Sequence, residues 1–245
     1  MPKASENIID LYVKFARKLL SKCSCLFDDF DCEIVKFLKI TDIDAYGFII
    51  DSYYLLEDTQ LAKENYKRFG PTGPTKYENF GEVYLRVYGV LNACYQQQQA
   101  ILQLCEKLGV KADVKEIKEF TLFDLRNTFA SHTVSRGYNK NKCSYILDRH
   151  SLIEGKLEGY SSNHKSAIDF KKANIEEEIN KWDILLASYL NKVSKILAEA
   201  TEQETLFESI SPMYSEVFER IDKMHAGGCH YSDVWDESAV CFVYK

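Results

Sequence analysis

Glycine and proline are scarce in this chain of 245 residues, which contains 11 and 4 of them respectively. A many-turned β architecture uses both residues freely, so their scarcity favours long helices. No apolar run approaches the roughly 20 residues needed to span a bilayer, and no apolar segment typical of a secretory signal follows the polar N-terminus. We therefore expect a mainly all-α protein located in the cytoplasm, with no membrane partner.

An excess of positive charge is also lacking, because the formal net charge is -6. Nucleic-acid binding depends largely on lysine and arginine, so a broad nucleic-acid patch is excluded and a small basic cleft is not. The sequence contains no glycine-rich phosphate loop, no G-x-S-x-G elbow and no H-E-x-x-H helix, which excludes the enzyme classes built on them. Hydrophobic residues make up 46% of the chain, enough for a packed core.

Apolar residues at helical spacing predict most of the fold. The predicted helices are 6–22, 77–108, 122–136, 174–200 and 205–223, and a further helix capped by Asp42 or Asp44 that runs through Leu56. A loop is predicted at 69–75. Thr121 and Asp124 fit an [ST]-x-x-[DE] capping box at the start of the 122–136 helix. The Gln96–Gln99 run is interpreted as a polar turn within a helix, because glutamine is a good helix former.

Two β-leaning runs over about 143–160 predict a small β-hairpin insertion. The β-like end of the chain, residues 239–244, is expected to pair with it. We therefore expect a single helical domain over residues 1–245, with this hairpin and a C-terminal extension at about 201–245.

One arrangement in the sequence suggests chemistry rather than packing: Arg126, Asn127 and His132, all in the predicted 122–136 helix. A histidine titrates near neutral pH and can move protons to or from a 2′-hydroxyl or a leaving 5′-oxygen. An arginine fork can hold a phosphate and stabilise charge on its oxygens, and Asn127 can orient one of these groups. The three residues predict RNA cleavage by attack of the 2′-hydroxyl, which requires no metal.

On an ideal helix, where each residue turns about 100°, Arg126 and His132 flank an apolar stripe formed by Leu122, Leu125 and Phe129. They are separated by about 9 Å along the axis, so one copy does not easily bring both to one phosphate. Two copies packed antiparallel about a two-fold axis would place Arg126 of one beside His132 of the other. This geometry predicts a homodimer with a composite site.

Arg126-Asn127-(four residues)-His132, late in a helical bundle, resembles the R-x4-6-H signature of the HEPN superfamily. Many members have a polar residue, often Asn, after the Arg and a small residue before the His, as Ser131 is here. The resemblance covers about residues 6–136 and the helix after the hairpin, and only the short motif is specific.

This resemblance implies a four- or five-helix up-and-down bundle that dimerises. Many HEPN proteins are metal-independent endoribonucleases of abortive infection, toxin–antitoxin systems or RNA processing. By resemblance, Arg126, Asn127 and His132 are the catalytic residues, RNA is the substrate, no cofactor is needed, and an antitoxin or other partner protein is expected. Other members have lost activity and act as binding modules, so a non-catalytic interaction or regulatory protein is the alternative.

Four residues after the motif are candidates for contact with RNA: Arg136, Tyr138, Lys140 and Lys142. If the hairpin folds back near the motif helix, the cations would guide an RNA backbone and the tyrosine would stack on a base. The alternative is an ordinary solvated loop.

Cysteine and histidine residues give weaker signals. His225, Cys229, His230 and Cys241 include the residue types that bind zinc, but their spacing matches no zinc-finger pattern, and a turn at Gly227-Gly228 explains the segment more simply. We expect no metal site. The eight cysteines are expected to be reduced, and most to be small core residues.

Overall fold

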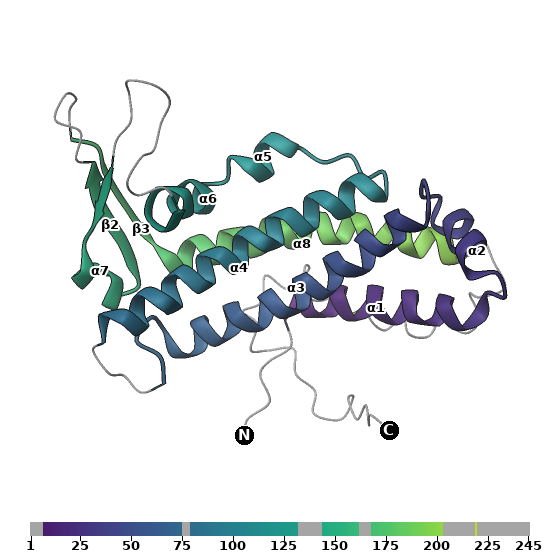
Figure 1. The fold of residues 1–245 in the computed structure, drawn as a ribbon, viewed down its shortest axis with the longest axis horizontal. Helices are drawn as coiled ribbons and strands as arrows, with labels where there is room; N and C mark the ends of the chain where they lie inside the picture. Colours follow the sequence, from purple (N-terminus) through teal and green to yellow (C-terminus); the bar gives the residue numbers. More distant parts are fainter. Residues whose placement is uncertain (1–6, 75–78, 132–143, 162–167, 203–218, 220–245) are drawn as a thin grey trace.

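Four long helices form the body of the protein in this computed structural model, which describes residues 7–74, 79–131, 144–161, 168–202 and 219 (Figure 1). They are α1 (Ile8–Leu26), α3 (Ile43–Phe69), α4 (Phe80–Lys107) and α8 (Ile175–Glu202). Helices α3 and α8 each pack against both α1 and α4. The prediction of a mainly all-α fold is confirmed. The predicted helices 77–108 and 174–200 agree with α4 and α8 to within three residues at each end. The helix predicted through Leu56 begins as α3 does, but α3 continues to Phe69.

The helices α1, α3 and α4 alternate in direction, as expected of an up-and-down bundle, and α8 departs from this order (Figure 1). Trp182, early in α8, donates its indole N–H to Gln97 of α4 at 3.1 Å. Further along both helices, burial raises the pKa of the Cys105 thiol, and the nearby charge of Lys192 partly opposes this effect. These contacts show that helices α4 and α8 are parallel. The segment between them must therefore return along the length of the bundle.

Side-chain caps fix the helix starts that the sequence predicts. The Asn7 side chain accepts hydrogen bonds from the backbone of Ile9 and Asp10, and Asp10 accepts one in return from the Asn7 backbone, which completes a capping box. Asp42, rather than Asp44, caps α3 through the backbone N–H of Ala45 at 2.8 Å. Two shorter helices, α2 (Phe30–Leu38) and α5 (Val114–Lys118), complete this part of the fold.

A three-stranded antiparallel sheet lies at one end of the bundle, with the order β1-β2-β3 (Figure 1). The strands are β1 (Tyr145–Leu147), β2 (Lys156–Ser161) and β3 (Phe170–Asn174), and a short helix α7 (Arg149–Ile153) joins the first two. The predicted pairing of two strands within 143–160 is confirmed. The prediction of a two-stranded hairpin is wrong in extent, because β3 adds a third strand to the sheet. The sequence Phe-Lys-Lys-Ala-Asn of β3 has no apolar alternation, so it gives no strand signal of its own.

The inner face of the sheet packs directly on the segment that carries the predicted motif. A Cβ atom added at Gly159 would lie 2.5 Å from the carbonyl oxygen of Ile146 and 2.5 Å from the ring of Phe129. Glycine is therefore required for Phe129 to approach the strand. Phe129 also meets Tyr145 edge to face, with ring centroids 6.0 Å apart. These contacts hold the sheet against the end of the motif.

A polar cluster crosses the core between α3, α4 and α8. Lys63 is fully buried, forms an ion pair with Asp183 and donates to the Gln97 side-chain oxygen at 2.8 Å. Lys67, which reaches the surface, contacts the second Asp183 oxygen at 2.7 Å. The glutamine run is thus a helical turn as predicted, and Gln97 within it is a buried member of an ionic network.

Asp10 and Glu64 bring two carboxyl groups together where α1 meets α3. The Asn7 amide donates to Glu64 at 2.7 Å, and burial together with the neighbouring Glu64 charge raises the pKa of Asp10 from 3.8 to about 7. A raised pKa means that folding favours the protonated form. The resulting stabilisation is complete below about pH 4 and is lost as the pH rises through about 7.

We therefore expect Asp10→Asn to remove a pH dependence of stability. In the wild type, this group should lower the free energy of unfolding between pH 4 and 7, with a slope of at most about 1.4 kcal/mol per pH unit. Urea denaturation at pH 5 and pH 8 measures the slope. Asp28→Asn removes a charge from an exposed loop and should leave the slope unchanged. An identical slope in wild type and Asp10→Asn would contradict the assignment.

No helix in the described part of the chain is both long and apolar enough to cross a membrane. The predicted helix 205–223 lies outside the described residues, apart from residue 219. The predicted C-terminal strand at 239–244 and the residues considered for zinc, His225, Cys229, His230 and Cys241, also lie outside them.

Candidate functional site

The predicted motif begins in an α-helix and continues in a π-helical turn. Helix α6 (Thr121–Arg126) ends at the motif arginine, and the π-helix η1 (Asn127–Ser131) follows. The prediction of one α-helix over 122–136 is therefore wrong for 127–131, and 132–136 lies outside the described residues. The Thr128 hydroxyl donates to the carbonyl oxygen of Asp124 at 2.7 Å, and this competition for a helical acceptor favours a widened turn. The ideal-helix separation of Arg126 and His132 consequently does not apply.

The start of α6 also differs from the prediction. Thr121 is the first helical residue, Phe120 precedes it, and no side-chain cap forms. Asp124 forms an ion pair with Lys171 of β3 instead of closing a capping box. Phe120 packs on Trp182 with ring centroids 5.6 Å apart. Aromatic packing and a contact with the sheet therefore position α6, and neither can be recognised from local sequence.

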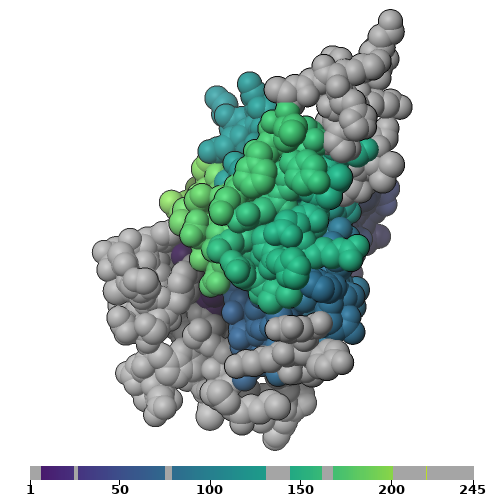
Figure 2. All heavy atoms as spheres, turned by 90° about the vertical axis from the view of Figure 1, so that its left-hand side faces the viewer, coloured from purple at the N-terminus to yellow at the C-terminus, as the bar shows by residue number. Residues whose placement is uncertain are grey.

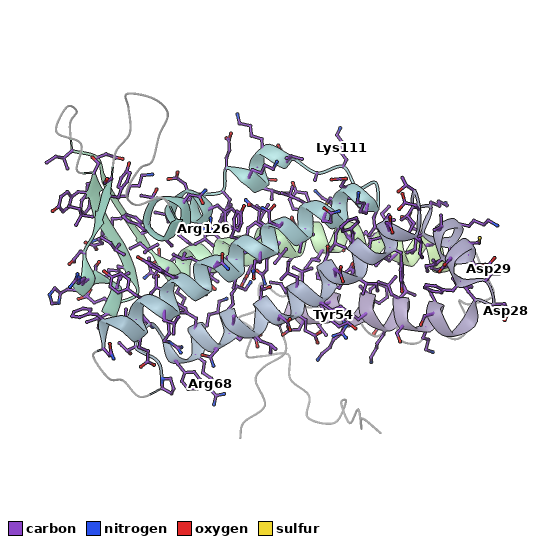
Figure 3. The ribbon with its side chains drawn as sticks, in the orientation of Figure 1. Asp28, Asp29, Tyr54, Arg68, Lys111 and Arg126 are labelled. Carbon is purple, nitrogen blue, oxygen red and sulfur yellow. The ribbon has the colours of Figure 1, made fainter. Side chains whose placement is uncertain are left out.

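Arg126 lies where α6 packs across α4 (Figure 3). Its guanidinium carbon is 4.2 Å from the ring centroid of Tyr95, which is a cation–π contact. Its Nη1 donates to the side-chain oxygen of Asn127 at 2.9 Å, and its Nη2 donates to that of Asn92 at 3.3 Å. The guanidinium is half-buried and held from three sides, with its orientation set in advance of any ligand.

The groups that hold Arg126 are neutral, and among the described residues no carboxylate forms an ion pair with it. Arg17 makes a useful contrast, because it lies over the Tyr54 ring at nearly the same distance, 4.3 Å, and also pairs with Glu57. The charge of Arg17 is matched by Glu57, whereas no described residue matches that of Arg126. An oriented, uncompensated guanidinium is suited to binding a phosphate or carboxylate.

The structure brings Arg126 and Asn127 together and adds Asn92 and Tyr95, which the sequence analysis did not identify. Asn92 and Tyr95 are three residues apart on α4, so they share a helix face, and this spacing is visible in the sequence. Nothing in the sequence indicates that this face meets Arg126. His132 and the four candidates for RNA contact, Arg136, Tyr138, Lys140 and Lys142, lie outside the described residues.

A groove of about 650 Å³ lies beside α6, between this helix, β3 and the start of α8. Its lining residues are Thr121, Asp124, Leu125, Lys156, Phe170, Lys171, Lys172, Ala173, Asn174, Glu177 and Glu178. Lys171 pairs with Asp124, and Lys172 pairs with Glu158 at 2.7 Å, so acidic neighbours compensate these cations. Arg126 does not line the groove.

The described residues contain no group of three or more His, Cys, Asp or Glu side chains arranged to hold a metal ion. Burial raises the pKa of the Cys94 thiol to about 12 and that of Cys105 to about 11. Neither is a thiolate at neutral pH, so neither is a nucleophile. The expectation that cysteines serve as core residues is confirmed for Cys23, Cys94 and Cys105, which are buried, whereas Cys32 is exposed.

No family model, curated protein or solved structure matches the chain. The resemblance to the HEPN superfamily therefore rests on the sequence motif, and a function must be argued from the site itself.

Proposed function

We propose that this protein is a metal-independent endoribonuclease of HEPN type. Arg126 binds and polarises the scissile phosphate, Asn127 holds Arg126 in place, and His132 transfers protons. The observation that carries the proposal is that Arg126 is oriented before any ligand binds. It lies over the Tyr95 ring, donates hydrogen bonds to two amide oxygens, and forms no ion pair with a carboxylate among the described residues. A π-helical turn directly after this arginine adds support, because such turns occur frequently at functional sites.

The reaction needs only groups that the motif supplies. The 2′-hydroxyl of the RNA attacks the adjacent phosphorus, so a new P–O2′ bond forms and the P–O5′ bond breaks. The 2′-proton passes to a base, the 5′-oxygen accepts a proton, and the products are a 2′,3′-cyclic phosphate and a 5′-hydroxyl. His132 has the chemistry for these proton transfers, and the Arg126 guanidinium stabilises the negative charge that develops on the phosphate oxygens.

The test is incubation of the full chain with RNA in the presence of EDTA. The wild type should give fragments with 2′,3′-cyclic phosphate ends, and His132→Ala, purified in the same way, should give none while its circular dichroism is unchanged. Equal cleavage by both proteins would indicate a contaminating nuclease and contradict the proposal. No cleavage by either would favour the alternative of a non-catalytic interaction or regulatory protein.

We further propose that two copies form a homodimer with composite sites. Mixing Arg126→Ala with His132→Ala chains tests this arrangement. In a mixed dimer, one composite site contains both functional residues, so about a quarter of the wild-type activity should return after random exchange. A site formed within one chain would show no such recovery.

By resemblance, this activity would serve phage defence or a stress response, with an antitoxin or other partner protein limiting it. The proposal places it in the cytoplasm, where cysteine thiols generally remain reduced.

A further inference from the structure

The outward face of the sheet carries a row of exposed apolar side chains, one from each strand. Ile146 of β1 is directly opposite Tyr160 of β2, and Tyr160 is directly opposite Phe170 of β3. All three are exposed, although the solvent face of an antiparallel sheet is usually polar. Ile168, just before β3, is also exposed. Contiguous exposed apolar surface of this kind typically marks an interaction site.

Two of these side chains are aromatic and lie on neighbouring strands. Tyr160 is 44% exposed and Phe170 is 59% exposed, so a large part of each residue is accessible to a ligand. Residues directly opposite on paired strands have Cβ atoms about 5 Å apart, which allows the rings to act as a pair. Figure 2 views the molecule from the end that carries the sheet, and the atoms of β2 and β3 form the centre of that face.

Positive charge accompanies the rings on this face. Side chains alternate along a strand, so Lys156 of β2 and Lys172 of β3 lie on the same face as Tyr160 and Phe170. Glu158, also on this face, pairs with Lys172 at 2.7 Å, and Lys156 pairs with Glu154 at 2.6 Å. Both are surface ion pairs, which contribute little to stability, so a phosphate can compete with the carboxylates for these lysines. Phe170 and both lysines also line the 650 Å³ groove, which continues to α6. Phe170 thus connects the aromatic pair with the groove beside the helix that carries Arg126.

We propose that this face is a stacking platform for single-stranded RNA, with one base on Tyr160 and one on Phe170 and with the phosphates near Lys156 and Lys172. The inference rests on the proposed function for the identity of the polymer. Base–aromatic stacking accepts any base, so it suits a binding surface with few hydrogen-bonding groups in its centre. The limited positive charge suits a short single-stranded segment rather than a long duplex.

Binding of a fluorescein-labelled 2′-O-methyl oligouridylate to the full chain, followed by fluorescence anisotropy, tests the platform. This probe has no free 2′-hydroxyl, so it reports binding without cleavage. Tyr160→Ala with Phe170→Ala should weaken binding about tenfold or more. Tyr160→Phe retains the ring and should retain the affinity.

A matched control removes one tyrosine and one phenylalanine elsewhere. Phe48 and Tyr54 are each 50% exposed on α3, away from the sheet, so Phe48→Ala with Tyr54→Ala should leave binding unchanged. Equal weakening by both double variants, or no binding by the wild type, would overturn the platform. Self-association of the wild type that Tyr160→Ala with Phe170→Ala abolishes, without any effect on RNA binding, would assign the row to contact between copies.

The two proposals can fail separately. If the wild type binds the probe through Tyr160 and Phe170 and does not cleave RNA, the platform is upheld and the nuclease assignment is wrong. If cleavage depends on His132 and the double variant binds the probe as the wild type does, the nuclease assignment is upheld and the platform is wrong.

Discussion

Asp183→Ala is expected to lower the free energy of unfolding by about 3–5 kcal/mol, because it leaves a buried lysine without its anion. Lys63 has no exposed side-chain surface and forms an ion pair with Asp183. Without that carboxylate, only the neutral side-chain oxygen of Gln97, 2.8 Å away, remains to stabilise the ammonium group. A charge that is cut off from water and unpaired must be neutralised or must disrupt the packing around it.

Removing both charges should recover much of this loss. Lys63→Met with Asp183→Leu replaces the ion pair by apolar groups, and such exchanges are often close to neutral. Lys67, the second partner of Asp183, has 29% of its side chain exposed and can turn to solvent. Urea denaturation of the two single variants and the double variant measures the coupling between the two positions.

Glu154→Ala provides the control for this prediction. Glu154 pairs with Lys156 at 2.6 Å on the surface, so its removal should cost less than about 1 kcal/mol. If Asp183→Ala were no more destabilising than Glu154→Ala, the buried pair would be unimportant for stability.

The buried network also shows where sequence reasoning ends. Hydrophobic periodicity is a local property, so it predicted α4, α8 and the first half of α3 well. Lys63 and Asp183 lie 120 positions apart and look like ordinary surface residues of two amphipathic helices. Their pairing depends on how those helices pack, which no local pattern specifies.

The motif illustrates the same limit at shorter range. The sequence identified Arg126 and Asn127, and the structure places them in contact. The sequence did not predict the π-helical turn. The turn depends on the Thr128 hydroxyl and on packing of Phe129 against Gly159, and a local pattern shows neither. Whether His132 approaches Arg126 stays a prediction.

Arg126→Ala is expected to have the second large effect, which is a loss of RNA cleavage rather than of stability. Loss of a preorganised donor to a charged transition state typically lowers kcat about 100- to 1000-fold, and we expect RNA cleavage to fall by this amount. Arg126→Lys should recover little, because an ammonium group cannot reproduce the two-pronged guanidinium contact with a phosphate. Single-turnover cleavage assays measure both changes.

Arg17→Ala is the matched control for the loss of an arginine. Both guanidinium groups are half-buried and stack on tyrosine, at 4.3 Å for Arg17 and 4.2 Å for Arg126. Arg17→Ala should leave cleavage unchanged, since Arg17 pairs with Glu57 and lies on a different helix from the motif. Similar loss of cleavage in both variants would contradict a specific role for Arg126.

Asn127→Asp separates the charge of Arg126 from its position. Asparagine and aspartate have nearly the same shape, and the Asn127 oxygen already accepts from Arg126 Nη1 at 2.9 Å. The variant should therefore keep Arg126 in place while matching its charge with a carboxylate. If Arg126 binds the phosphate, cleavage should fall in Asn127→Asp although the fold remains as stable as in the wild type. If Arg126 only holds α6 against α4, the added ion pair should strengthen that contact and leave cleavage intact, which would rule out phosphate binding by this residue.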